Sequence, residues 1–125
     1  MPLQIATTYH GGIAVLQCEG RIVLGEPEFR AALREAWAGG AKRIVLDFAG
    51  VDYMDSSGIG ELVSAYTTTR NSGGELVLAG LTKKVRDLLT ITKLITVFQV
   101  FDNADAAIGS LGNVGQSQVR DEPTA

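Results

Sequence analysis

The sequence has little cysteine and no long apolar run, and each shortage excludes a class of protein. The single cysteine, Cys18, excludes an internal disulfide and a CxxC metal site, and its apolar strand context predicts a buried side chain. No apolar segment reaches the ~18 residues that a membrane-spanning helix needs. Residues 1–12 lack a basic start followed by an apolar run, so no secretory signal is expected. These absences predict a cytoplasmic protein without a membrane partner.

Basic residues are too few for a nucleic-acid-binding surface. Lys and Arg number 11 against 14 Asp and Glu, which gives a net charge of -3, whereas nucleic-acid-binding domains usually carry a basic face. What the chain does have is 125 residues, 46% of them hydrophobic. That length and composition are typical of one globular domain with its own core.

Short strand patterns alternate with helical patterns along the chain. Strands are predicted at residues 3–9, 13–19, 43–48, 75–79 and 96–101. Helices are predicted from Pro27 to the glycines at 39–40, from the DSSGIG turn (55–60) onward to residue 71, and over residues 82–90 and 102–110. The first two strands flank the turn His10-Gly11-Gly12, which indicates a hairpin.

This order, β-β-α-β-α-β-α-β-α, predicts an α/β domain. Strands that alternate with helices form parallel pairs with helices packed on the sheet, here entered through an antiparallel hairpin. The run at 43–48 is almost wholly apolar, as expected for a central strand covered on both faces. Residues 112–125 are polar and contain Gly and Pro, which predicts a domain over residues 1–111 and a disordered tail over 112–125.

The sequence DSSGIG (55–60) joins the central strand to a helix and concentrates polar chemistry in six residues. A catalytic serine needs a nearby base, but the one histidine, His10, falls in the predicted hairpin turn. The nucleophile-elbow pattern Gly-x-Ser-x-Gly is absent as well. Asp47, Asp52 and Asp55 are not expected to form a metal site, because Asp47 lies in mid-strand. The sequence therefore predicts no catalytic residue and no metal.

Two further interpretations concern the glycines and the serines of this segment. Gly58-Ile59-Gly60 resembles the start of a dinucleotide fingerprint, but Val63 occupies the third glycine position and the glycines follow the helix start. Ser56 is placed to act as the helix N-cap. Each glycine inside a helix costs about 0.5–1 kcal/mol relative to alanine, so Gly58 and Gly60 indicate a reason such as close approach of a partner. No cofactor is expected.

The chain resembles the STAS family, and within it the bacterial anti-sigma factor antagonists. The resemblance rests on MDSSGIG (54–60), on RIVLDFAGVDY (43–53) before it and on GGELVLAGL (73–81) after it, and it covers residues 3–111. It implies a mixed sheet of four or five strands with about four helices packed against it.

The resemblance also implies a non-enzymatic switch. Ser56 would be phosphorylated by an anti-sigma factor with serine kinase activity, with Ser57 the second choice, and a phosphatase would restore it. The unmodified protein would bind the anti-sigma factor through a surface that comprises Asp55, Ser56, Ser57, Gly58, Ile59, Gly60, Val23 and Glu26. Val23 stands where many family members carry an aspartate, and Glu26 could supply that charge. The alternative is a STAS module that is never phosphorylated and acts in a larger signalling assembly or as a small-ligand sensor.

Overall fold

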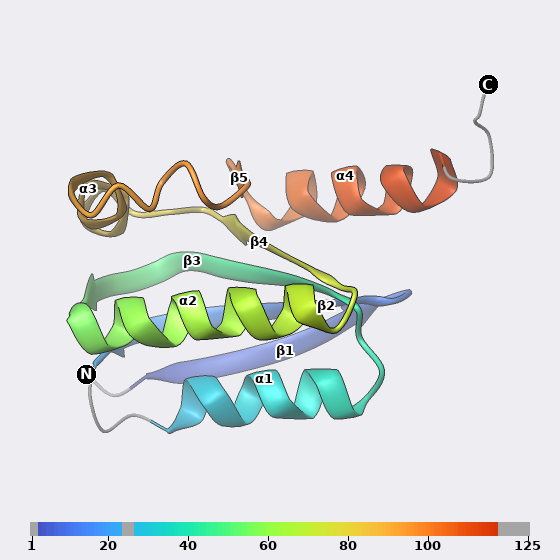
Figure 1. The fold of residues 1–125 in the computed structure, drawn as a ribbon, viewed down its shortest axis with the longest axis horizontal. Helices are drawn as coiled ribbons and strands as arrows, with labels where there is room; N and C mark the ends of the chain where they lie inside the picture. The colour runs from blue at the N-terminus through green and yellow to red at the C-terminus, as the bar shows by residue number, and fades with distance from the viewer. Residues whose placement is uncertain (1–2, 24–26, 118–125) are drawn as a thin grey trace.

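The computed structural model describes residues 3–23 and 27–117, and the predicted order of strands and helices is confirmed. The elements are β1 (Gln4–His10), β2 (Ile13–Ile22), α1 (Glu28–Ala38), β3 (Arg43–Met54), α2 (Ser56–Asn71), β4 (Glu75–Ala79), α3 (Lys83–Ile91), β5 (Val100–Phe101) and α4 (Ala104–Ser117). Figure 1 shows the strands as one sheet with helices around it.

The five strands form one mixed sheet in the order β1-β2-β3-β4-β5. The β1–β2 pair is antiparallel, with His10 opposite Ile13 across the predicted turn. The other three pairs are parallel because each connection passes through a helix. The predicted α/β class and mixed sheet are therefore confirmed, and β3 is the central strand that its apolar sequence predicted.

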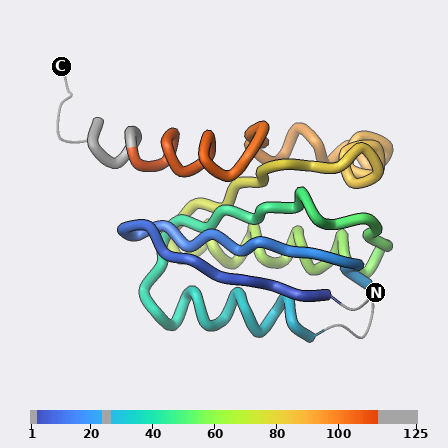
Figure 2. Tube along the Cα trace, turned by 180° about the vertical axis from the view of Figure 1, so that it is seen from behind, coloured from blue at the N-terminus to red at the C-terminus, as the bar shows by residue number. Residues whose placement is uncertain are grey.

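Alternate residues of the central strands face two different groups of helices. Leu16, Ile44 and Leu46 belong to the main core, which also takes in buried side chains of α1, α2 and α3. Val45 and its neighbours Val15 and Val77 form a second apolar cluster with buried residues of α4. Figure 2 shows α4 on the opposite side of the strands from α1. Within the described residues, no helix has both the length and the apolar character required to cross a membrane.

The strand predicted at residues 96–101 is reduced to Val100–Phe101, which pair with Leu78 and Ala79. The apolar residues before it pack from a turn instead of a strand. Phe98 is buried, and its ring meets that of Tyr66 edge-on with 5.0 Å between centroids. The strand assignment for residues 96–99 was therefore wrong, and of the apolar residues there Phe98 is buried whereas Val97 is exposed.

Helix α4 continues to Ser117, so the disordered tail predicted from residue 112 does not begin there. Ala107 and Leu111 are buried against the sheet and fix the first turns of the helix. Extending an existing helix is far easier than nucleating one, which explains why weak helix formers continue it. Residues 118–125 lie outside the described part of the chain, and the domain boundary at residue 111 stays a prediction.

Cys18 is buried within β2, as its apolar context predicted. Burial, with a smaller contribution from the carboxylate of Asp47, raises the pKa of the Cys18 thiol to about 12. The thiolate is the reactive form of cysteine. Cys18 therefore behaves as a small core residue and not as a nucleophile.

Candidate functional site

The predicted site lies where β3 ends and α2 begins, and a single residue, Asp55, makes the connection. The backbone of Asp55 is extended, with φ -105° and ψ -174°. Its N–H donates to the carbonyl oxygen of Ile22 at the end of β2, with an N···O distance of 3.3 Å. The start of α2 is thus attached to the ends of two neighbouring strands.

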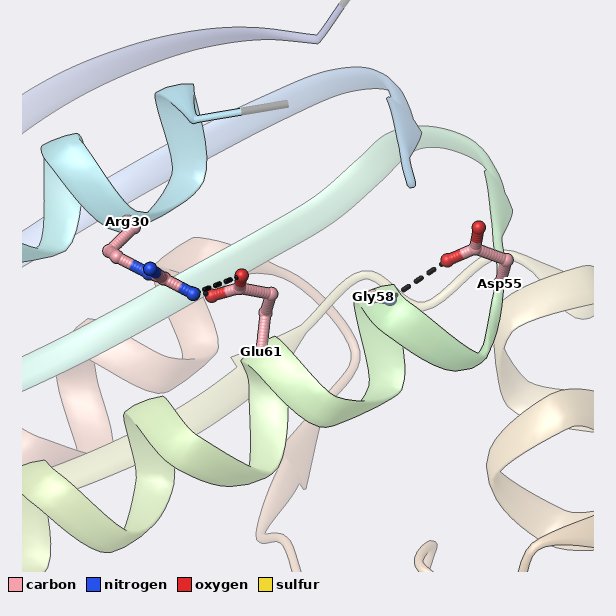
Figure 3. A network of polar contacts seen from close by, with 4 residues as sticks. All are labelled: Arg30, Asp55, Gly58 and Glu61. Atoms are coloured by element: carbon pink, nitrogen blue, oxygen red, sulfur yellow. Dashed lines mark hydrogen bonds and ion pairs between the residues drawn. The ribbon is translucent and has the colours of Figure 1, made fainter. Parts of the chain in front are cut away.

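Asp55, and not Ser56, is the N-cap of α2. The Asp55 side chain accepts a hydrogen bond from the backbone N–H of Gly58 through Oδ1, at 2.9 Å (Figure 3). Both residue types cap helices, but a carboxylate also gains from the positive end of the helix dipole. The N-cap interpretation of Ser56 is therefore wrong, and Ser56 is the first residue of the helix proper.

The capping role of Asp55 leaves the hydroxyl of Ser56 available. Ser56 is exposed, and its side chain makes no hydrogen bond among the described residues. Ser57, the second predicted candidate, is half-buried at the next position. Of the two hydroxyls, that of Ser56 is the one that an approaching protein reaches first.

The two glycines of the first helical turns serve different ends. Gly58 is buried, and a Cβ there would overlap the carbonyl oxygen of Ile22 and lie 2.6 Å from Cγ of Met54. Gly58 therefore allows α2 to pack onto the strand ends, and its explanation by partner approach is wrong. Gly60 is exposed, and a Cβ there would meet nothing within 4 Å. Of the two glycines, only Gly60 leaves the exposed surface of this turn without a side chain.

The structure brings Val23 to the same junction. Val23 directly follows Ile22, whose carbonyl accepts the hydrogen bond from Asp55, and its side chain is half-buried. Ile59 is half-buried and packs against the main core, so it anchors the first turn of α2. Glu26, the other predicted member of the surface, lies outside the described residues.

An ion pair joins α1 to α2 one turn beyond the serines. Arg30 donates to Glu61 through two nitrogens, with Nη2–Oε2 at 2.6 Å and Nε–Oε1 at 3.3 Å (Figure 3). The Arg30 side chain is 61% exposed, and exposed pairs contribute about 0–1 kcal/mol. The ion pair therefore links α1 to α2 at the surface and adds little to the stability of the domain.

The sequence predicted no role for two exposed residues beside the junction. Arg21 of β2 pairs with Tyr53 of β3 in the sheet register, and its Cζ lies 4.7 Å from the centre of the Tyr53 ring. Tyr53 is 43% exposed. An aromatic residue just before DSSGIG was visible in the sequence, but its partner depends on the register of two parallel strands.

The structure also separates His10 from Ser56. His10 pairs with Ile13, which in turn pairs with Arg43, the first residue of β3. Ser56 follows the opposite end of this strand of 12 residues, and at about 3.3 Å per residue the separation is roughly 40 Å. The single histidine of the chain is therefore not a general base for Ser56.

Comparison with known proteins identifies the family. A family model described as STAS domain matches residues 4–107. The chain belongs to the STAS domain family. It is also 27% identical over 113 residues to an anti-sigma F factor antagonist of Paenibacillus polymyxa, an alignment that covers 89% of this chain and 97% of that relative. The predicted family resemblance is confirmed.

Solved structures give the same fold. An anti-sigma factor antagonist from Mycobacterium paratuberculosis superposes with a TM-score of 0.77 at 19% identity, covering 86% of this chain and 92% of that one. The Bacillus cell fate determinant SpoIIAA in its phosphorylated form superposes with a TM-score of 0.68 at 20% identity, covering 87% and 98%. At these identities the likeness establishes the STAS fold.

Proposed function

We propose that this STAS protein is a non-enzymatic anti-sigma factor antagonist that works by partner switching. It binds an anti-sigma factor with serine kinase activity while Ser56 is unmodified, and releases it once Ser56 is phosphorylated. The observation that carries the proposal is the Asp55 cap, which leaves an exposed Ser56 hydroxyl at the first position of α2. The name of the Paenibacillus polymyxa relative supports the same function.

A phosphate on Ser56 is compatible with the folded domain. It adds a charge of about −1.5 to −2 at pH 7, and the unpaired N–H groups and dipole of a helix N-terminus favour negative charge there. The Ser56 hydroxyl makes no hydrogen bond in the described chain that modification would break. The modified protein therefore keeps its structure, and the change is confined to its surface.

The same phosphate is incompatible with a close partner interface. It stands directly after the Asp55 carboxylate, so two negative groups face a partner that had accommodated one acid and a small hydroxyl. A loss of about 3 kcal/mol weakens binding more than a hundredfold, since each 1.4 kcal/mol is tenfold. Repulsion and bulk at a desolvated contact supply losses of that order. The switch requires no refolding.

The alternative function, a STAS module that is never phosphorylated, is favoured by one observation. Val23 places an apolar, half-buried side chain beside the junction, at a position where an acid could orient the serine hydroxyl or receive its proton. In the switch proposal the kinase supplies that carboxylate, or Glu26 does.

ATP and sigma factors are cytoplasmic, so we place the switch in the cytoplasm, with a phosphatase that resets it.

The test uses a candidate serine kinase of the anti-sigma class, sought first among the genes that neighbour the gene for this chain. Wild type, Ser56→Ala, Ser57→Ala and Ser64→Ala are incubated with the kinase and ATP, and intact-mass spectrometry measures phosphate incorporation. Ser64 is an exposed serine of the same helix and serves as the matched control. We expect one phosphate in every protein except Ser56→Ala, which should still bind the kinase.

Incorporation that disappears only in Ser57→Ala would move the modification to the second serine. A wild type that binds the kinase and accepts no phosphate would favour the non-phosphorylated module. A wild type that binds no such kinase would refute the antagonist function.

A further inference from the structure

Arg21 and Tyr53 form an exposed pair near the ends of β2 and β3, beside the junction with α2. Ile22 and Met54, the next residue of each strand, are buried in the main core. Because side chains alternate between the two faces of a strand, Arg21 and Tyr53 point away from that core. The guanidinium lies over the ring, with Cζ 4.7 Å from its centre.

The charge of Arg21 is not neutralised within the described chain. The ion pairs there are Arg30–Glu61, Arg43–Glu75 and Lys83–Asp87. Arg21 belongs to none of them, and its guanidinium lies over the Tyr53 ring. A cation over a ring face is held in place electrostatically. The planar guanidinium therefore keeps its hydrogen-bond donors free while its position is partly fixed.

We propose that this pair is a second contact point for the anti-sigma partner, and that the partner places a carboxylate side chain against Arg21. The inference rests on the proposed function. Arg and Tyr are enriched among the residues that dominate binding energy at protein interfaces. A guanidinium fork fits a carboxylate with two parallel hydrogen bonds, and a pre-oriented side chain loses less entropy when it binds.

The backbone connects this contact to the switch. The hydrogen bond from Asp55 to Ile22 attaches the residue before Ser56 to the residue after Arg21. A partner that covers Ser56 and extends along this connection would meet the end of β2. A carboxylate held at Arg21 is repelled by a phosphate on Ser56, so the phosphate weakens both contacts, and the partner's acid makes the switch more sensitive to phosphorylation.

The experiment measures binding of the same candidate serine kinase, without ATP, by calorimetric titration. The variants are Arg21→Glu, Tyr53→Ala and Tyr53→Phe, with Lys42→Glu as the control. Lys42 is exposed, precedes the opposite end of β3, and undergoes the same change of charge. Unchanged melting temperatures verify that each variant is folded.

We expect Arg21→Glu to weaken binding tenfold or more and Tyr53→Ala about fivefold, since charged pairs at interfaces contribute on this scale. Tyr53→Phe and Lys42→Glu should stay within twofold. Wild-type affinity should fall between 50 and 300 mM salt more steeply than that of Arg21→Glu. Replacing one acidic residue of the kinase by lysine should restore binding to Arg21→Glu.

The outcomes separate this inference from the proposed function. If wild type binds while Arg21→Glu and Tyr53→Ala bind within twofold of it, the second contact is refuted and the antagonist function stands. If Lys42→Glu loses as much affinity as Arg21→Glu, the effect is one of net charge and the specific contact is refuted. If wild type does not bind, both fail together.

Discussion

Replacing Gly58 by alanine should destabilise the protein even though alanine is the better helix former. At an exposed helical position this change gains about 0.5–1 kcal/mol. At Gly58 the new methyl group would overlap the Ile22 carbonyl oxygen and lie 2.6 Å from Cγ of Met54. That carbonyl belongs to the backbone and accepts the hydrogen bond from Asp55, so it cannot move aside without loosening the junction.

The magnitude follows from the two opposing effects. Overpacking a well-packed site costs typically about 1–3 kcal/mol, which exceeds the propensity gain. Gly60→Ala is the matched control because its Cβ would meet nothing within 4 Å, and it should stabilise the protein by about 0.5–1 kcal/mol. The propensity gain is common to both variants, so they should differ by the overpacking cost, roughly 1–3 kcal/mol. At about 4 °C per kcal/mol for a domain of this size, their Tm values should differ by roughly 4–12 °C.

Thermal and urea unfolding followed by circular dichroism at 222 nm measures this difference. Gly58→Ala should also weaken partner binding, since the first turn of α2 carries Ser56 and has to shift outward. Equal Tm values for Gly58→Ala and Gly60→Ala would refute the close packing of α2 on the end of β2.

Four further outcomes are expected. Cys18 should not react with a thiol reagent at pH 8 unless urea is added. Because the pKa of its thiol rises from 9.0 to about 12 on folding, the stability that Cys18 contributes is complete below pH 9. Urea titrations should show that this contribution declines from pH 9 to 12. Truncation after Leu111 keeps the buried anchors of α4, so Tm should fall by no more than about 4 °C; a larger loss would show that the removed residues dock on the sheet. Ser56→Asp should weaken kinase binding about tenfold by calorimetry, and undiminished affinity would contradict the electrostatic switch. Val23→Asp should speed phosphate incorporation modestly in a kinase assay, and an unchanged rate would show that the kinase needs no acid at that position.

The order of the elements could be predicted because it depends on local patterns. The apolar runs of β2 and β3 and the helical stripe of α1 are visible in the sequence, and the hairpin turn has a glycine signature. The start of β5 could not be predicted, because Phe98 packs in the core against the ring of Tyr66 and not in a strand ladder. A buried turn and a buried strand have the same composition over a few residues.

The candidate site was located from the sequence, but its internal roles were not. Asp55 and Ser56 are both good caps, and only the hydrogen bond to Gly58 distinguishes them. The reason for Gly58 depends on how closely α2 approaches Ile22, a distance set by the whole sheet. The pairing of Arg21 with Tyr53 required a register that contains a local irregularity between Gly20 and Arg21.

Adjacent residues at the ends of β2 and β3 serve separate purposes, and this has a consequence for evolution. Ile22, Met54 and Gly58 are buried and pack at the junction, whereas Arg21 and Tyr53 are exposed. Gene duplicates can therefore change the outward residues without losing the fold. In a bacterium with several such switches, we expect divergence at these outward positions to prevent each antagonist from binding the anti-sigma factors of the other switches.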